Sequence, residues 1–342
     1  MPLWKVCNMI KKPYLLFVGD VQDAIYAKTA AGVQYWRPEQ AAGQFRFPGG
    51  VDLGLPDYDM KAAVDAGLKT ILIGVAPQGG KLPQNWLDFL LEGLGAGLDI
   101  ASGLHVRLAE VPELKAAAEK YGRQIFDVRF PTQSFNVGTG ALREGKRLLT
   151  VGTDCAVGKM YAALALEKEM QSQGLKATFR ATGQTGILIA GSGVSVDAVV
   201  SDFISGATEY LSPPNSPDHW DILEGQGSLY HPAYAGVSLG LLHGAQADAI
   251  VVCHQAGREN VKGIEGYTLP TLKDCIALNL QMGGRTNPNI TCVGININTS
   301  SLSEDAAMDY LKKTEDDLGL PCVDPVRTGV GPIVDKLIKD KI

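Results

Sequence analysis

Short apolar runs alternate along this chain with longer stretches in which apolar residues recur at helical spacing. Such alternation predicts an α/β fold, in which parallel sheets are covered by helices. The first half is expected to hold strands at 14–18, 70–75 and 124–128 and helices at 58–67, 85–95 and 111–122. The second half is expected to hold strands at 176–181, 221–223, 249–253 and 291–297 and helices after 158, near 196, 233 and 271, and over 303–317.

A polar segment that contains glycines runs from 131 to 145, between the two halves. It precedes an apolar strand that enters a glycine loop. Polar, glycine-bearing stretches are typical of connections between compact units. We therefore expect two layered domains, over residues 1–144 and 145–342.

The glycine loop is the most informative motif. It follows the apolar strand, precedes a helix-forming run, and reads Gly152, Thr153, Asp154, Cys155, Ala156, Val157, Gly158 and Lys159. The glycines let backbone N–H groups converge on an anion, and Lys159 adds a positive charge at the start of the helix. Strand, loop and helix together predict a phosphate-binding loop. The alternative is a tight strand-to-helix turn with an exposed lysine.

Two features distinguish this loop from the common nucleotide-binding pattern. Five residues rather than four separate Gly152 from Gly158, and Met160 stands where Ser or Thr usually follows the lysine. That hydroxyl normally holds the magnesium ion of a nucleoside triphosphate. A methionine cannot replace it, so the sequence favours phosphate binding that does not require magnesium.

Polar groups also follow other predicted strands, where parallel sheets place their ligands. Arg180 and Gln184 lie in a glycine-broken loop that is suited to a carboxylate, although such loops are nearly as often plain turns. Glu224 ends the strand at 221–223 and is a candidate metal ligand or proton acceptor, or else a cap or ion-pair partner. His231 follows in the same loop, where a histidine before proline often only forms hydrogen bonds.

A third polar cluster follows the apolar strand at 249–253. His254 is a candidate general base and Arg258 a candidate anion clamp. The alternative is that both residues stabilise a surface loop.

Composition narrows the class of protein. The 342 residues are 45% hydrophobic and carry a net charge of -6 without a basic run, which argues against nucleic acid and anionic membranes as partners. No segment resembles a signal peptide or a membrane span, so a cytoplasmic location is expected. Six scattered cysteines suggest neither a zinc site nor a disulfide framework.

The motifs resemble two related families. The glycine loop and Glu224-Gly225-Gln226-Gly227 resemble dethiobiotin synthetase, a phosphate-loop enzyme with the wider glycine spacing, over part of the second domain. Five motifs spread across nearly the whole chain resemble the D-glutamate N-acetyltransferase (DgcN) family. They are the two motifs above together with Ile73-Gly74-Val75-Ala76-Pro77, Ser102-Gly103-Leu104-His105 and Thr182-Gly183-Gln184-Thr185-Gly186.

That resemblance implies a Rossmann-like N-terminal domain, a C-terminal P-loop NTPase-like domain with a parallel sheet, and acetyl transfer from acetyl-CoA to D-glutamate. Coenzyme A presents phosphates that a loop and lysine can bind without metal, so Met160 favours this activity over an ATP- and magnesium-dependent ligase or kinase. We expect residues 152–160 to bind coenzyme A, without a required metal. A homo-oligomer with small-molecule substrates is expected.

Chemistry rather than the resemblance assigns the individual roles. The substrate amine is mostly an ammonium at neutral pH, so a base such as Glu224 or His254 must accept a proton. Lys159, backbone N–H groups of the loop or His231 would stabilise the developing oxyanion. Arg180 and Arg258 would bind the two carboxylates. A covalent acetyl-cysteine at Cys155 is a further alternative.

Overall fold

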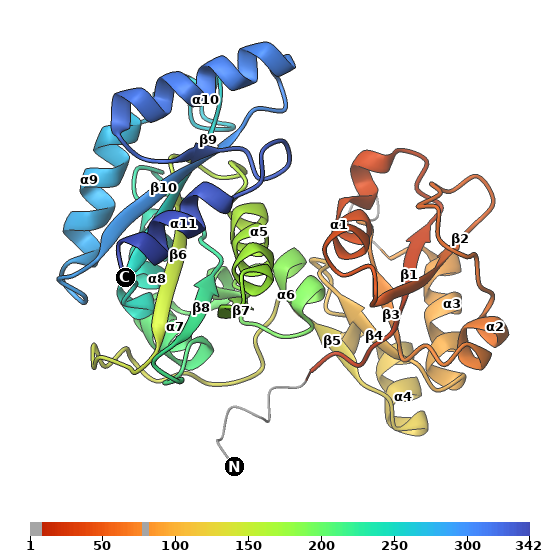
Figure 1. Ribbon diagram of the computed structural model, residues 1–342. Helices are drawn as coiled ribbons and strands as arrows, with labels where there is room; N and C mark the ends of the chain where they lie inside the picture. Colours follow the sequence, from red (N-terminus) through yellow and green to blue (C-terminus); the bar gives the residue numbers. More distant parts are fainter. Residues whose placement is uncertain (1–8, 77–81) are drawn as a thin grey trace. The chain divides into compact units, whose positions relative to one another are not determined.

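The computed structural model describes residues 9–76 and 82–342, which form two compact α/β units (Figure 1). Unit 1 combines Met1–Gln133 with Gly183–Ala198, and unit 2 combines Ser134–Thr182 with Val199–Ile342. Part of the motif at 73–77 lies outside the described residues. No helix among the described residues is long and apolar enough to cross a membrane.

Unit 1 is built on a sheet of five parallel strands in the order β2-β1-β3-β4-β5. The strands are β1 (Tyr14–Gly19), β2 (Ala41–Arg46), β3 (Thr70–Ile73), β4 (Asp99–Ser102) and β5 (Ile125–Asp127). The helices are α1 (Lys28–Trp36), α2 (Met60–Asp65), α3 (Gln84–Gly95), α4 (Pro112–Tyr121) and α6 (Gln184–Ala190), with 3-10 turns η2 (Ala24–Ala27), η4 (Leu108–Glu110) and η5 (Val196–Ala198).

Helices cover both faces of this sheet. Helices α1 and α6 contact each other on one face, and α3 and α4 pack together on the other (Figure 1). The strand order reverses between β1 and β3, and at such a point the connections that leave the two strands run to opposite faces of the sheet, which leaves a crevice outside the carboxyl ends of the strands. Gly74 lets α1 approach the end of β3, because a Cβ atom there would lie 2.2 Å from the Cβ of Ala30.

Unit 2 is built on a sheet of six parallel strands in the order β11-β10-β9-β6-β8-β7. The strands are β6 (Lys146–Gly152), β7 (Lys176–Arg180), β8 (His219–Leu223), β9 (Ala249–Gln255), β10 (Thr291–Asn298) and β11 (Cys322–Val323). The helices are α5 (Lys159–Ser172), α7 (Ile204–Leu211), α8 (Ala235–Ala245), α9 (Leu272–Gly283), α10 (Glu304–Leu318) and α11 (Gly331–Lys339), with the turn η6 (Ser201–Phe203).

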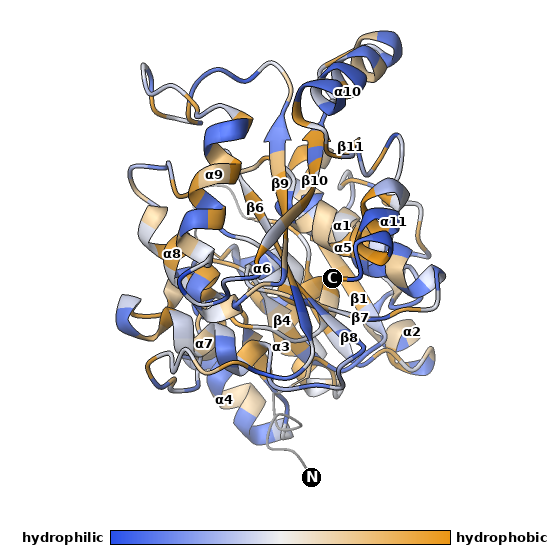
Figure 2. Ribbon diagram, turned by 60° about the vertical axis from the view of Figure 1, so that its left-hand side comes forward, coloured by the Kyte–Doolittle hydropathy of each residue, from blue (hydrophilic) through white to orange (hydrophobic). Residues whose placement is uncertain are grey.

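The two faces of this second sheet carry different helices. Helices α5 and α11 contact each other on one face, while α7, α8 and α9 form a contiguous layer on the other (Figure 1). Figure 2 shows apolar residues along β9 and β10 and mainly hydrophilic residues on α10. This distribution places the core of unit 2 between the sheet and its two helical layers.

Strand register aligns the ends of β6, β8 and β9. Leu149 of β6 lies opposite Leu223 of β8 and Ile250 of β9, and Gly152 lies opposite Cys253. Because parallel strands in register end at the same edge, the residues that follow β6, β8 and β9 meet there.

The predicted fold class is confirmed. Four helices and three strands lie outside the predicted set: α1, α6, α7, α11, β2, β4 and β11. Strand β2 has the sequence AAGQFR, which lacks β-branched residues and an apolar run. It forms a strand because it pairs with β1, a contact that local propensity does not encode.

The compact units do not divide at the expected boundary near 145. The chain crosses between them after Gln133, and Gly183–Ala198 returns to unit 1. The segment before 145 joins unit 2 because the Glu209 carboxylate accepts the backbone N–H groups of Thr139 and Gly140. These contacts are separated by about seventy residues in sequence, beyond the reach of a local pattern.

Two helical glycines of unit 2 provide a matched test of this packing. A Cβ atom at Gly206 on α7 would lie 1.8 Å from the carbonyl oxygen of Asn136, whereas nothing lies within 4 Å at Gly236 on α8. Gly206→Ala should therefore destabilise the protein by about 1–3 kcal/mol, while Gly236→Ala should be neutral or stabilise it by about 0.5–1 kcal/mol. Urea unfolding measures both, and equal midpoints would contradict this packing.

Candidate functional site

The predicted phosphate loop connects β6 to α5 in unit 2. The backbone N–H of Thr153 donates to the carbonyl of Cys253 at 3.0 Å, which continues the pairing of β6 with β9. The chain then curls, with positive φ at Ala156 (54°) and Gly158 (98°), before α5 begins at Lys159. A glycine at 158 meets this demand without the steric cost that a side chain would add. The loop thus has the strand-turn-helix geometry of an anion site.

Lys159 is buried at the base of this loop. Its Nζ donates to the carbonyl oxygen of Asp154 at 2.7 Å, and its side chain is only 7% exposed. Burial lowers the pKa of Lys159, because the charged ammonium is separated from water. An incoming phosphate would replace a neutral carbonyl as the partner of this ammonium, which strengthens the interaction.

The Asp154 carboxylate organises the loop from inside. One oxygen accepts the backbone N–H of Cys155 at 2.7 Å. The other accepts the Arg258 guanidinium at 3.0 Å and the backbone N–H of Lys262 at 2.8 Å. Asp154 is fully buried, so these donors compensate for the removal of its charge from water.

Arg258 reaches the phosphate loop from the segment that follows β9. Besides Asp154, it donates to the carbonyl oxygens of Cys155 at 2.7 Å and Ala156 at 3.4 Å, and it contacts Gln255. Its guanidinium therefore lies against the loop, while its charge is balanced by Asp154. Arg258, predicted as an anion clamp, thus lies beside the loop with its charge already paired, and its role in binding stays a prediction.

Glu224 lies at the end of β8 beside the phosphate loop. Its carboxylate accepts the backbone N–H of Thr182 at 2.9 Å, and its main-chain carbonyl accepts the Thr182 hydroxyl at 2.6 Å. The next residue, Gly225, has no room for a side chain, because a Cβ atom would lie 1.6 Å from the carbonyl oxygen of Thr150. Glu224 is thus buried and held against the end of β7.

His254 lies at the end of β9, next to the first residue of the loop. Its Nδ1 and the Thr153 hydroxyl oxygen are 3.0 Å apart, within hydrogen-bond distance. Burial, with a smaller contribution from the Arg258 charge, lowers the pKa of His254 to about 4. The imidazole is therefore neutral at neutral pH, which is the form that can accept a proton.

His254 also lines a cavity of about 460 Å³ within unit 2. The other lining residues come from α9, α10 and the turn before α9: Pro270, Thr271, Leu272, Lys273, Tyr310, Lys313, Thr314, Asp317 and Leu318. Two lysines and one aspartate give this wall a positive charge balance. The cavity has both apolar and cationic surfaces, and His254 is the residue that connects it with the phosphate loop.

His231 is buried on the other side of Asp154. Its Nδ1 accepts the backbone N–H of Ala233 at 3.1 Å, so the ring proton is placed on Nε2 when the imidazole is neutral. Nε2 lies 4.0 Å from the Asp154 carboxylate, and the ring stacks on Tyr234. His231 therefore fixes the loop after β8 near the phosphate loop.

Asp154, Cys155 and His231 form one group with metal-ligand spacing among the described residues. Both carboxylate oxygens of Asp154 already accept hydrogen bonds, and burial raises the pKa of the Cys155 thiol despite the nearby Lys159. A thiol in this state is a poor metal ligand and a poor nucleophile at neutral pH. Lys159 lowers the pKa of this thiol, but burial outweighs that effect, which argues against the alternative of an acetyl-cysteine at Cys155.

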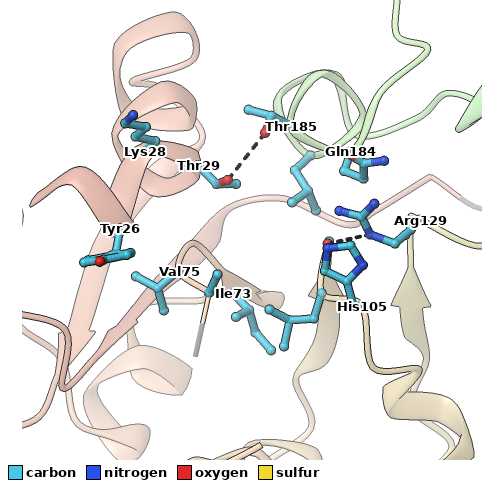
Figure 3. Close-up of a pocket in the computed structure, with 13 residues that line it drawn as sticks. Tyr26, Lys28, Thr29, Ile73, Val75, His105, Arg129, Gln184 and Thr185 are labelled. Atoms are coloured by element: carbon cyan, nitrogen blue, oxygen red, sulfur yellow. Dashed lines mark hydrogen bonds between the residues drawn. The ribbon is translucent and has the colours of Figure 1, made fainter. Parts of the chain in front are cut away.

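The two remaining predicted site residues lie in different units. Arg180, in unit 2, donates through Nε and Nη2 to one oxygen of the buried Asp221, at 2.8 Å in each case. Gln184, in unit 1, donates to Ser195 at 3.2 Å and lines a separate cavity (Figure 3). Arg180 ends β7 and Gln184 begins α6, and the chain passes from one unit to the other between them.

Sequence patterns did not identify two contributors to the site. The backbone N–H of Lys262 binds Asp154, and a backbone donor carries no sequence signal. Asn296 of β10 is buried, and its side-chain nitrogen would lie 3.5 Å from a Cβ atom on Gly158. A polar residue between Ile295 and Ile297 in an apolar strand is a signal that would have found it.

Two family models match this chain. Residues 44–131 match the DUF1611_N Rossmann-like domain, and residues 136–334 match the DUF1611_C P-loop domain, both described as domains of unknown function. A crystal structure of a DUF1611 family protein from Anabaena variabilis is similar to this chain, with a TM-score of 0.81 and 30% identity. The match covers 96% of this chain and 100% of that protein.

Two curated relatives carry an enzyme name. A D-glutamate N-acetyltransferase from Tritonibacter scottomollicae is 50% identical over 330 residues, which are 96% of this chain and 99% of the relative. A D-glutamate N-acetyltransferase from a Pseudoalteromonas species is 47% identical over 329 residues, with the same coverage. Similarity therefore extends over both units.

The environment of His254 predicts a dependence of stability on pH. Its folded pKa of about 4 lies below the ordinary value of 6.5, so the unfolded chain binds a proton first as pH falls. Stability from this group is full above pH 6.5 and declines by on the order of 3 kcal/mol as pH falls to about 4.

His254→Gln should therefore lose less stability than the wild type over this range in urea unfolding. His105→Gln, which removes an exposed imidazole of unit 1, serves as the control. The same pH dependence in His254→Gln and wild type would contradict a buried neutral imidazole.

Proposed function

Because the chain belongs to the DUF1611 family, we propose that it transfers an acetyl group from acetyl-CoA to the amino group of D-glutamate. Its near-complete match to two D-glutamate N-acetyltransferases supports an acyltransferase that acts on this amino acid. The product would be N-acetyl-D-glutamate. The cytoplasmic location and homo-oligomeric assembly expected from the sequence remain predictions.

The phosphate loop without a magnesium-binding hydroxyl is the observation that carries the acetyl-CoA assignment. Lys159 and the backbone N–H groups at the start of α5 are suited to the phosphates of coenzyme A. Met160 provides no hydroxyl ligand for the magnesium ion that an ATP-dependent ligase or kinase needs. We therefore propose that the loop binds coenzyme A without a required metal.

The cavity beside His254 offers space for the part of the cofactor that the phosphate loop does not bind. Its volume of about 460 Å³ is within the usual range for organic ligands, and Tyr310 and Leu318 contribute apolar surface. Lys273 and Lys313 are suited to a further phosphate group. We propose that this cavity receives part of coenzyme A adjacent to its pyrophosphate.

In the proposed reaction the substrate ammonium first releases one proton to solvent, and the nitrogen of the free amine then attacks the thioester carbonyl. The carbon-nitrogen bond forms, the carbonyl oxygen becomes an oxyanion, and the carbon-sulfur bond then breaks to release the coenzyme A thiolate. The second nitrogen proton passes from the tetrahedral intermediate to a base and finally to the thiolate. Donors at the oxyanion lower the barrier to attack, and we propose loop N–H groups and Lys159 for this role.

His254 is favoured over Glu224 as the base. His254 lines a cavity and is neutral at neutral pH, whereas the Glu224 carboxylate accepts the N–H of Thr182. A base role for His254 requires its Nδ1–H to donate to Thr153, which leaves Nε2 to accept the proton. Its lowered pKa makes it a weak base, suited to the more acidic N–H of the tetrahedral intermediate.

The contacts of Arg180 and Arg258 argue for a role other than binding the two substrate carboxylates. Arg180 is paired with Asp221 and Arg258 with Asp154, so neither guanidinium brings an uncompensated charge to a carboxylate. We propose that both position the strand ends that surround the phosphate loop. His231, which lies against Asp154, is proposed to have the same positioning role.

Lys159→Ala tests the phosphate contact. The loss of a charge-assisted contact should weaken coenzyme A binding about ten- to a hundredfold, as measured by calorimetry on the folded variant. Lys168→Ala removes an exposed lysine from the same helix and should bind as the wild type does. If Lys159→Ala retains full affinity, this lysine does not contact the cofactor.

A second experiment separates the candidate bases in an acetyl-transfer assay with D-glutamate. His254→Gln should lower kcat about 10²–10⁴-fold with little change in coenzyme A affinity, because a general base acts on the chemical step. Glu224→Gln retains an acceptor for the N–H of Thr182 and should have the smaller effect. The reverse order of effects would assign the base to Glu224, and near wild-type turnover in both would exclude both.

A further inference from the structure

Unit 1 contains a cavity of about 220 Å³ that the phosphate loop does not account for (Figure 3). It lies beyond the carboxyl ends of β1 and β3, where the strand order reverses, because its walls come from the segments that follow β1, β3, β4 and β5 and from α6. The lining residues are Tyr26, Lys28, Thr29, Ile73, Val75, Ala76, Gly103, Leu104, His105, Arg129, Gln184, Thr185 and Leu188. In open parallel sheets this reversal of strand order is the place where ligands bind.

Two cations border this cavity. Arg129 follows β5 and uses Nε to donate to the carbonyl oxygen of Gly103 at 3.3 Å. Across the described residues, no carboxylate lies within ion-pair distance of Arg129 or of Lys28, which begins α1. The arginines beside the phosphate loop, by contrast, are paired with buried aspartates. The cavity therefore has positive charge that its own walls leave uncompensated.

The remaining walls provide hydrogen-bonding groups and an apolar floor. Figure 3 shows Arg129, His105 and Gln184 together on one side, with Tyr26, Lys28 and Thr29 on the other. The Thr29 and Thr185 hydroxyl oxygens lie 3.4 Å apart and join α1 to α6. Ile73, Val75, Leu104 and Leu188 supply apolar surface, and none of the described residues that line the cavity is acidic.

This composition discriminates between classes of small anion. Carboxylates are suited to a guanidinium and an ammonium at opposite sides of a cavity, and a short aliphatic chain is suited to the apolar floor. A free ammonium on the ligand would have no carboxylate to pair with among these walls and would be repelled by both cations. An N-acyl group removes that charge and adds a methyl.

We propose that this cavity binds a small dicarboxylate that lacks a free ammonium group. Its assignment to N-acetyl-D-glutamate rests on the proposed function, because that compound is the product of the reaction. The site is thus a second small-molecule site, in the Rossmann-like unit, that favours the acylated product over the zwitterionic acceptor.

Calorimetric titration of the full-length protein with glutarate, N-acetyl-D-glutamate and D-glutamate tests this site. Glutarate and the N-acetyl compound should bind, and D-glutamate should bind more weakly in this cavity. Arg129→Gln and Lys28→Gln should each weaken binding of both dicarboxylates about ten- to a hundredfold. Lys115→Gln, which removes an exposed lysine of α4 outside the cavity, is the matched control and should bind as the wild type does.

The outcomes separate the two proposals. Absence of glutarate binding, or equal affinity in the wild type and the Arg129 and Lys28 variants, would overturn the site. Binding of D-glutamate that depends on Arg129 and exceeds that of glutarate would overturn the exclusion of an ammonium. Glutarate binding needs no acetyl transfer, so an inactive protein that still binds glutarate through Arg129 would contradict only the proposed function.

Thermal denaturation shows whether each variant is folded. If Arg129→Gln is unfolded, the binding measured with Lys28→Gln tests the site instead, because Lys28 is exposed. Arg129→Lys keeps the positive charge and should recover part of the affinity.

Discussion

A buried carboxylate inside the phosphate loop is the interaction on which the candidate site depends. Asp154 accepts hydrogen bonds from Cys155, Arg258 and Lys262, and thereby joins the end of β6 to the segment after β9. Removal of a partner from such an arrangement would leave a charge without compensation away from water, which is strongly unfavourable. The carboxylate thus fixes the curl of the loop before any ligand binds, and a preformed anion site costs less to organise on binding.

Strand register and two close approaches complete this arrangement. The alignment of β6 with β8 and β9 brings Glu224 and His254 to the loop, and Gly225 allows the chain after β8 to pass against Thr150. The same burial that holds His254 in place lowers its pKa to about 4. Position and chemistry are therefore coupled at this residue, because its surroundings determine both where the imidazole lies and which form it adopts.

Much of the fold follows from local patterns, whereas the partners of the site residues do not. The glycine loop and the apolar strand before it were readable at positions 148–159, because strand, turn and helix signals agree there. The sequence predicts that Arg180 and Arg258 lie near strand ends, but their pairing with Asp221 and Asp154 depends on contacts between distant segments. The sequence predicts that Gln184 lies in the same loop as Arg180. The two residues belong to different units, because the chain passes from unit 2 to unit 1 between them.

The cations beside the phosphate loop and those around the cavity of unit 1 thus differ in whether a carboxylate compensates their charge. In unit 2 the arginines beside the loop are neutralised by buried carboxylates, and Lys159 donates to a main-chain carbonyl that a phosphate would replace. In unit 1 the cations around the cavity have no such partner among the described residues. We therefore propose that anion binding at the phosphate loop depends on backbone N–H groups and one lysine rather than on a cluster of unpaired charges.

Coenzyme A is proposed to bind this loop without a metal ion. Calorimetry of the purified protein tests it most directly, with acetyl-CoA titrated in the presence of a chelator and ATP titrated separately with magnesium. We expect acetyl-CoA to bind with unchanged affinity when divalent ions are removed, and ATP with magnesium to bind more weakly. Tight binding of ATP only with magnesium, together with no binding of acetyl-CoA in the chelator, would contradict the account.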